Sequence, residues 1–99
     1  MKDINKIEIT INSINKNIEI SIDTNNMTIN NSPIYKSKLE ELLSIICLWK
    51  YEYGNSNIID AEEFTVKVYT NSKIDKFHGK GTYPKNYEAF LNLVGELYE

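Results

Sequence analysis

The chain has 99 residues, 41% of them hydrophobic and 25% charged, and its net charge is −3 at pH 7. We expect one globular domain, residues 1–99, with no membrane partner, because no apolar run approaches the roughly 20 residues of a spanning helix. The acidic balance and the absence of arginine argue against general nucleic-acid binding, since arginine supplies the paired hydrogen bonds of phosphate and guanine recognition.

Cysteine content and the N-terminus indicate the compartment. The single cysteine, Cys47, cannot form an intramolecular disulfide, and the first residues lead into a polar–apolar alternation instead of an apolar signal segment. We therefore expect a cytoplasmic protein. The abundance of isoleucine, asparagine and lysine indicates an AT-rich coding genome, such as that of a bacterium or a phage.

The first third of the chain has the period-two pattern of strands. Residues 7–11 and 18–22 alternate isoleucine with polar residues, which predicts two strands that each bury one face. A polar turn separates them, and residues 27–29 form a short third strand. The simplest arrangement is a three-stranded antiparallel meander.

A helix is predicted next, over about residues 38–51. Ser37 and Glu40 match a capping box, and Gly54 is expected to end the helix. Its apolar stripe at helical spacing consists of Leu39, Leu42, Leu43, Ile46, Trp49 and Tyr53. Because the second half is apolar almost all round, Cys47 is expected to act as a small buried hydrophobe.

The remaining chain predicts two more strands and a final helix. Residues 64–68 alternate, a turn at Asn71 leads to a strand near residues 74–78, and residues 84–98 have helical periodicity. The apolar stripe of that helix consists of Tyr87, Phe90, Leu91, Val94, Leu97 and Tyr98. The order β-β-β-α-β-β-α predicts an α+β two-layer sandwich, an antiparallel sheet of about five strands with both helices on one face.

The stretch Gly79-Lys80-Gly81 could bind phosphate or could be structural. A phosphate-binding loop needs its lysine after the second glycine, at the helix start, but here Lys80 lies between two glycines and Pro84 follows. Alternatively, the glycines allow a bulged strand end and the proline opens the final helix. The structural interpretation is favoured, and a nucleotide-binding turn stays open.

Catalytic and metal sites are not predicted. His78 is the only histidine, and a pairing with Cys47 is conceivable but has no supporting motif. Asp60, Glu62 and Glu63 are grouped, yet they lack a calcium-loop spacing. We expect no enzymatic activity and no cofactor.

A partner surface is predicted from lysines and aromatics. Residues 73–85 contain four lysines and one aspartate, a basic stretch that suits an acidic partner or protects an edge strand from aggregation. Tyrosine and tryptophan are typical of protein interfaces. The candidate partner-binding residues are Tyr51, Tyr53, Tyr69, Lys76, Lys80 and Tyr83. A homodimer that forms through the apolar face of residues 42–49 is a further alternative.

Residues 37–98 resemble a small domain of uncharacterised bacterial proteins. The resemblance is carried by Trp49 with Tyr53, by Asp60-Ala61-Glu62-Glu63-Phe64 leading into a strand, and by Gly79-Lys80-Gly81-Thr82-Tyr83-Pro84-Lys85-Asn86-Tyr87 at the start of the final helix. Ala61 stands where that domain has a glycine. The resemblance implies an α+β fold and brings no activity.

These features favour a non-enzymatic protein-binding protein. An inhibitor or antidote fits best, either a phage or mobile-element anti-defence protein or a toxin-immunity partner, with a nucleic-acid-processing enzyme as the target by analogy. The alternative is a small-ligand or nucleotide-binding domain that uses the Gly79-Lys80-Gly81 turn.

Overall fold

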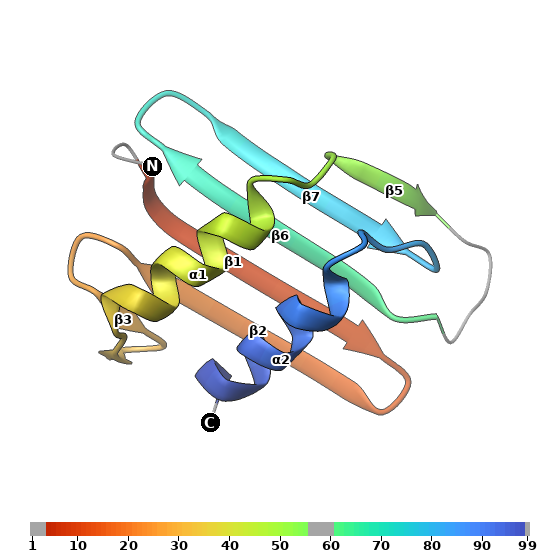
Figure 1. Cartoon of the computed structure of the whole chain (residues 1–99), viewed down its shortest axis with the longest axis horizontal. Helices are drawn as coiled ribbons and strands as arrows, with labels where there is room; N and C mark the ends of the chain where they lie inside the picture. The colour runs from red at the N-terminus through yellow and green to blue at the C-terminus, as the bar shows by residue number, and fades with distance from the viewer. Residues whose placement is uncertain (1–3, 56–60, 99) are drawn as a thin grey trace.

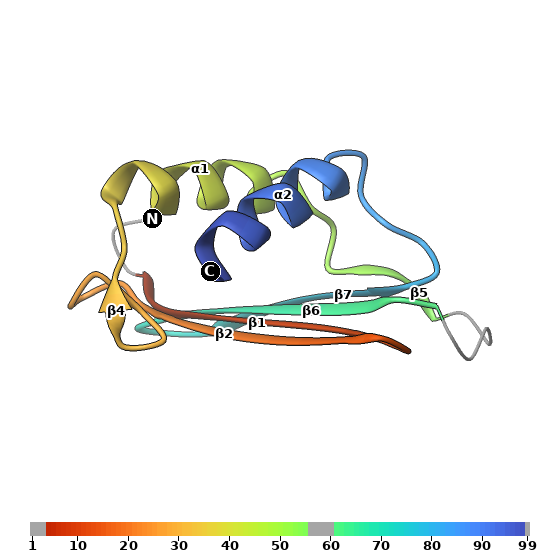
Figure 2. The ribbon, with the colours of Figure 1, turned by 90° about the horizontal axis from the view of Figure 1, so that it is seen from below.

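The computed structural model describes residues 4–55 and 61–98. They form two layers, a seven-stranded sheet and a layer of two helices that lie on the same face of it (Figure 1, Figure 2). The predicted α+β class and the placement of both helices on one face are confirmed. The sheet differs from the prediction of about five antiparallel strands, because it has seven strands and one pair is parallel.

The N-terminal strands form the predicted meander and continue past it. β1 (Ile4–Ser13) pairs with β2 (Lys16–Asp23), which pairs with β3 (Thr28–Ile29), and β3 pairs with β4 (Ser32–Pro33), all antiparallel. The isoleucines of β1 and β2 face the helices in register, and polar side chains occupy the other face. β4 was missed because two residues are too few to show a period.

The turn between β3 and β4 fixes the edge of β2. Asn30 and Asn31 have φ angles of 47° and 69°, which is the left-handed geometry of a tight hairpin turn. The Asn30 side chain accepts a hydrogen bond from the Ser21 amide (2.9 Å) and donates one to the Glu19 carbonyl (3.4 Å). One asparagine side chain thus takes the place of a paired strand along part of β2.

Helix α1 (Lys36–Ile46) is shorter than predicted and has a different cap. The amides of Lys38 and Leu39 donate to the Tyr35 carbonyl, so Tyr35 is the N-cap. Its side chain makes no capping bond, and the predicted capping box at Ser37 is wrong. The helix ends at Ile46 and not near residue 51. There the chain tightens into turns, which direct the next residues back to the sheet.

The segment after α1 becomes an edge strand. β5 (Glu52–Asn55) runs parallel to β7 (Ile74–Lys80), and β6 (Glu63–Thr70) pairs antiparallel with both β1 and β7. The sheet order is β4-β3-β2-β1-β6-β7-β5. Gly54 lies inside β5 with a φ of 114°, so the expectation that it ends the helix was wrong.

Helix α2 (Tyr87–Tyr98) begins three residues later than predicted. The Tyr87 amide donates to the Pro84 carbonyl, so Pro84 belongs to the turn before the helix. Its buried side chains are Tyr87, Phe90, Leu93 and Val94. Leu93 was missing from the predicted stripe, whereas Tyr98 is 49% exposed and Leu91 and Leu97 are half-buried. No helix among residues 4–55 and 61–98 is long and apolar enough to cross a membrane.

The core lies between the helices and the sheet. No polar or charged residue is buried among the described ones, and the core is built from isoleucine, leucine, valine and aromatic rings. Trp49 is 7% exposed, with its ring 4.8 Å from Phe90 and 5.3 Å from Phe64 between centroids. The predicted burial of Trp49 is confirmed, although it lies beyond the helix to which it was assigned.

Candidate protein-binding surfaces

The open face of the sheet carries three of the predicted partner-binding residues. Tyr69, Lys76 and Lys80 alternate with inward-facing residues of β6 and β7, so they lie on the side away from the helices. Tyr69 donates a hydrogen bond to Glu8, whose other oxygen lies 3.1 Å from the Lys6 ammonium group. The bonds from Tyr69 and Lys6 lower the pKa of the Glu8 carboxyl. Because these three groups satisfy one another, Tyr69 offers little unused bonding capacity to a partner.

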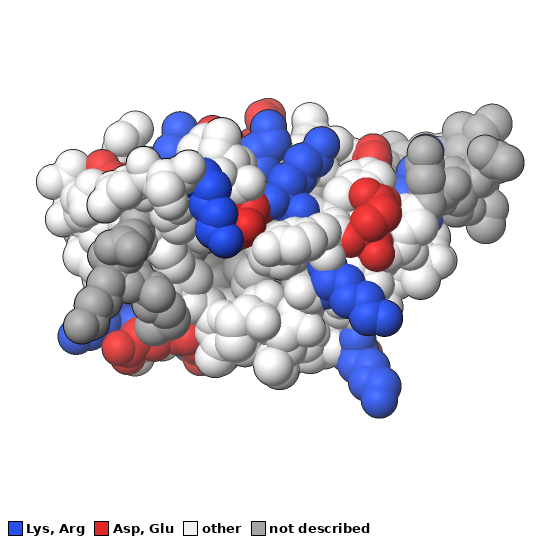
Figure 3. Space-filling view, turned by 90° about the horizontal axis from the view of Figure 1, so that it is seen from above, with Lys and Arg blue, Asp and Glu red and all other residues white. Residues whose placement is uncertain are grey.

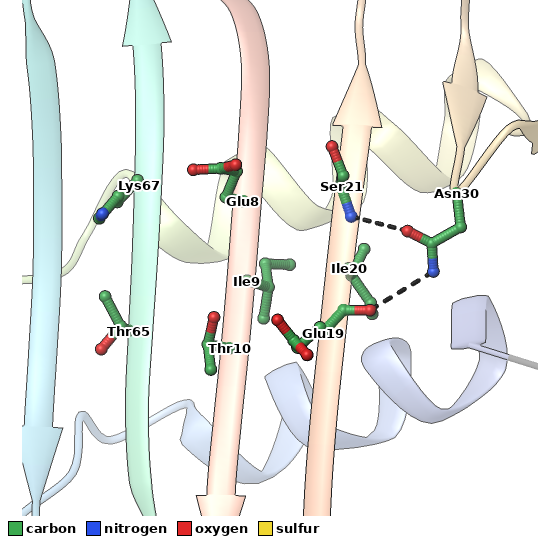
Figure 4. Close-up of a pocket in the computed structure, with 9 residues that line it drawn as sticks. All are labelled: Glu8, Ile9, Thr10, Glu19, Ile20, Ser21, Asn30, Thr65 and Lys67. Carbon is green, nitrogen blue, oxygen red and sulfur yellow. Dashed lines mark hydrogen bonds between the residues drawn. The ribbon is translucent and has the colours of Figure 1, made fainter.

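A shallow polar hollow of ≈ 210 Å³ lies beside them on this face (Figure 4). Thr10 and Thr65 are paired across β1 and β6, and their short side chains leave space between the longer Glu8, Glu19 and Lys67. The lining combines both charge signs with hydroxyl groups. It has the chemistry of a hydrated sheet surface and no group aimed at one ligand.

A second hollow lies at the edge formed by β5 and β7. Tyr51 and Lys76, both predicted as partner-binding, line it together with Glu52, Gly54 and His78. The Tyr51 hydroxyl donates to Asp75, which also lies 3.6 Å from the Lys73 ammonium group. Seen from this edge, lysine groups lie beside carboxylate groups (Figure 3). The predicted basic stretch is therefore partly neutralised in the fold.

His78 is held between two carboxylates. Its Nδ1 lies 2.8 Å from Glu52 and its Nε2 lies 2.6 Å from Glu63, so the imidazole bridges β5 and β6. The hydrogen bonds to Glu63 and then Glu52 raise the pKa of His78. Both ring nitrogens are therefore engaged in hydrogen bonds within the chain.

Cys47 is remote from His78 in the fold. It caps the C-terminal end of α1 in the helix layer, whereas His78 is on the opposite face of the sheet. The cysteine is exposed, with its Sγ 3.2 Å from the Ser44 carbonyl, so the expectation of a buried thiol was wrong. No group of three metal-ligating side chains is present among residues 4–55 and 61–98, and Asp60 lies outside these residues.

Packing explains Gly79 and backbone geometry explains Gly81 in the Gly79-Lys80-Gly81 stretch. A Cβ on Gly79 would lie 2.6 Å from the ring of Phe64, its cross-strand partner, and 2.7 Å from the Thr82 carbonyl oxygen. Gly81 has a φ of 84°, which favours glycine. The stretch ends β7 instead of opening α2, so its amides are not those of a helix start.

The third hollow lies where α1 ends and the turn into α2 begins, and we call it the helix-end hollow. It has a volume of ≈ 440 Å³ and is lined by Leu48, Trp49, Lys50, Tyr53, Tyr83, Pro84, Lys85 and Asn86. Tyr53 and Tyr83 are the other two predicted partner-binding residues. The structure thus distributes the six candidates over three surfaces. Tyr51 and Lys76 share one hollow and Tyr53 and Tyr83 share another, whereas Tyr69 and Lys80 lie at opposite ends of the β6–β7 pair.

Hydrogen bonds fix the walls of the helix-end hollow. Trp49 donates from Nε1 to Asn86 Oδ1 (2.7 Å), and Asn86 donates to the Ile45 carbonyl (3.3 Å). The Tyr53 hydroxyl accepts from the Lys50 amide (2.7 Å). These bonds hold the two segments together, so the shape of the hollow is preformed.

An apolar side chain is left in water beside these walls. Leu48 is 77% exposed and directly precedes Trp49. The exposure of Leu48 was not predicted because the apolar run around it fitted a longer buried helix, and Lys50 and Lys85 were not among the candidate residues. Comparison of the chain with known families, with curated proteins and with solved structures found no match.

Proposed function

We propose that this protein is a non-enzymatic protein-binding protein, an inhibitor or antidote, and that it binds its partner through the helix-end hollow. The observation that carries this proposal is the exposed Leu48 beside a recess walled by Trp49, Tyr53 and Tyr83. Binding hot spots typically combine aromatic residues with an apolar anchor in a well-packed pocket.

The rigidity of this surface supports the same proposal. Binding costs less free energy when the interface is ordered beforehand. The bonds of Trp49 to Asn86 and of Tyr53 to Lys50 supply that order. Ile14 is equally exposed, at 77%, but it is an isolated side chain in the β1–β2 turn and does not line the hollow.

The small size and acidic charge of the chain support the proposed biological setting. A cytoplasmic anti-defence protein of a phage or mobile element, or the immunity partner of a toxin, needs only one such docking surface. We propose a nucleic-acid-processing enzyme as the target by analogy with small inhibitors that cover a catalytic surface.

The test is affinity capture from host cells with two matched variants. Leu48→Glu and Ile14→Glu place the same charge on equally exposed side chains, one at the hollow and one outside it. We expect the wild type and Ile14→Glu to capture the same protein at stoichiometric amounts and Leu48→Glu to lose it. Equal capture by all three would overturn the proposal, and recovery of the chain itself would indicate a homodimer instead.

A further inference from the structure

The charges around the helix-end hollow differ in sign from the chain as a whole. Its lining contains Lys50 and Lys85 and no acidic residue among the described ones, although the chain carries a net charge of −3. We infer that the hollow binds an acidic segment of the partner that inserts one large apolar side chain between these two lysines. This inference rests on the proposed function and specifies the chemistry of the bound segment.

The walls of the helix-end hollow determine which apolar side chain of the partner segment can bind. Leu48, Trp49, Tyr53 and Pro84 present mostly carbon atoms, and the polar atoms of Trp49 and Tyr53 already bond within the chain. A polar side chain would lose its hydration there without gaining a hydrogen-bond partner. An aromatic or branched aliphatic side chain has no hydrogen bonds with water to lose, and it removes part of Leu48 from water.

The lysines at the rim of the helix-end hollow favour acidic residues in the partner segment. Lys50 and Lys85 are exposed, and no carboxylate of the described residues lies within 4 Å of either ammonium group. Carboxylates that flank the inserted side chain would pair with these two lysines, whereas basic residues would be repelled. Such rim charges select the partner and accelerate association more than they add affinity.

A membrane surface is the other apolar and anionic candidate, and the geometry disfavours it. Trp49 is only 7% exposed and Tyr53 is half-buried, so the aromatic groups form a recess and do not project as an inserting wedge. Residues that anchor proteins at a bilayer surface lie on a protruding apolar face. A recess between two lysines matches a protruding side chain of another protein.

The only tryptophan of the chain lines the hollow and gives a direct readout. The probe is a synthetic peptide, Asp-Glu-Phe-Glu-Asp, and the controls are the same peptide with alanine at the centre and its basic counterpart, Lys-Lys-Phe-Lys-Lys. We expect a saturable change in Trp49 fluorescence with the acidic peptide alone. No saturable change, or an equal change with the basic peptide or with phosphatidylserine vesicles, would overturn the inference.

Charge reversal tests the two lysines directly. In the double variant Lys50→Glu/Lys85→Glu we expect binding of the acidic peptide to weaken about tenfold and binding of the basic peptide to appear. Lys36→Glu/Lys73→Glu changes the net charge equally at exposed sites outside the hollow and should bind as the wild type does. Equal weakening in both double variants would show a general charge effect and contradict a local contact.

The peptide result and the capture result separate the two proposals. A host protein that depends on Leu48 but is captured equally well by Lys50→Glu/Lys85→Glu would leave the docking surface standing and overturn the acidic segment. Capture that ignores Leu48 would overturn the proposed function. Thermal unfolding of each variant excludes misfolding as the reason for lost binding.

Discussion

The two ends of the core are built differently. Where β1 begins, the sheet is lined by aliphatic side chains such as Ile7 and Ile22, which pair across β1 and β2 under α1. Where β1 ends, the core is aromatic, and the ring of Phe64 packs on Trp49 and Tyr87. The core side chains of the aliphatic end carry no polar atoms, whereas those of the aromatic end add hydrogen bonds from ring hydroxyl and indole groups.

Those hydrogen bonds connect the core to the loops. Tyr83 donates to the Glu62 carbonyl and Tyr87 to the Glu62 carboxylate, and burial with this last bond raises the pKa of the Tyr87 hydroxyl. A branched aliphatic side chain fills space but leaves adjacent loops free to adjust. An aromatic residue with a polar atom fixes the loop as well. The aromatic end is therefore the place where a preformed surface can be built.

The largest expected effect comes from removing the centre of the aromatic end. Trp49→Ala should lower the free energy of unfolding by about 3–5 kcal/mol, because it leaves a cavity among Phe64, Phe77 and Phe90. At the aliphatic end, Ile9→Val should cost about 0.5–1.5 kcal/mol. Urea unfolding measures both. A loss below about 1 kcal/mol for Trp49→Ala would place the ring outside the core.

Two glycines test how tightly the aromatic end is packed. Gly79→Ala should destabilise by about 1–3 kcal/mol, since the added methyl group would overlap the Phe64 ring. Gly95→Ala is the control, because nothing lies within 4 Å of its added Cβ and alanine is the better helix former by about 1 kcal/mol. Melting temperatures should move in opposite directions, and a shared direction would refute the packing described for Gly79.

Asn30 allows a comparison outside the core, at the edge of β2. Asn30→Gly keeps the left-handed backbone accessible but removes the bonds to Ser21 and Glu19, so stability should fall by about 1 kcal/mol. The amide hydrogen of Ser21 should exchange with solvent faster in this variant. Unchanged protection at Ser21 would mean that the asparagine side chain does not pair with β2.

His78 makes the stability of the fold depend on pH. Its pKa is raised by Glu63 and Glu52, so the folded state binds the proton more tightly than the unfolded state. The stabilisation is fully present below an unfolded pKa of about 6.5 and is lost as pH rises through the folded value. The excess stability of the wild type over His78→Gln should therefore shrink as the pH rises above about 6.5. Parallel stability curves for the two proteins would contradict the bridge.

The smallest effect is expected at Lys80. Lys80→Ala should change stability by less than about 0.5 kcal/mol, as at ordinary surface sites, and should leave partner capture unchanged. The measurement is thermal unfolding with and without added nucleotide. A nucleotide-induced rise in melting temperature that Lys80→Ala abolishes would instead support the phosphate-binding interpretation of the glycine turn.

The sequence predicted the two layers of the fold correctly, but it did not predict the edge strands or the end of α1. The alternation in residues 7–11 and 18–22 and the stripe around Phe90 placed strands and a helix correctly because each pattern is long. The end of α1 was misplaced because Trp49 and Tyr53 continue the helical spacing. Pairing of β5 with β7, a long-range contact, decides that the chain leaves the helix at Ile46.

The candidate site was only partly predictable for a related reason. Composition identified the tyrosines as a group, and Tyr53 and Tyr83 do line the helix-end hollow. Nothing in the sequence shows that residues 48–53 and 83–86 meet, because the bond from Trp49 to Asn86 joins positions 37 residues apart. The exposure of Leu48 becomes evident only once the helix is known to end before it.

The most direct test of the account is photo-crosslinking in host cells at three positions. A photo-reactive amino acid is placed at the position of Leu48 in the helix-end hollow, of Tyr69 on the open face of the sheet, or of Ile14 in the β1–β2 turn. The account predicts one strong crosslinked product from the position of Leu48 and only background from the other two. A product confined to the position of Tyr69 would show that the partner binds the open face and would contradict the central claim.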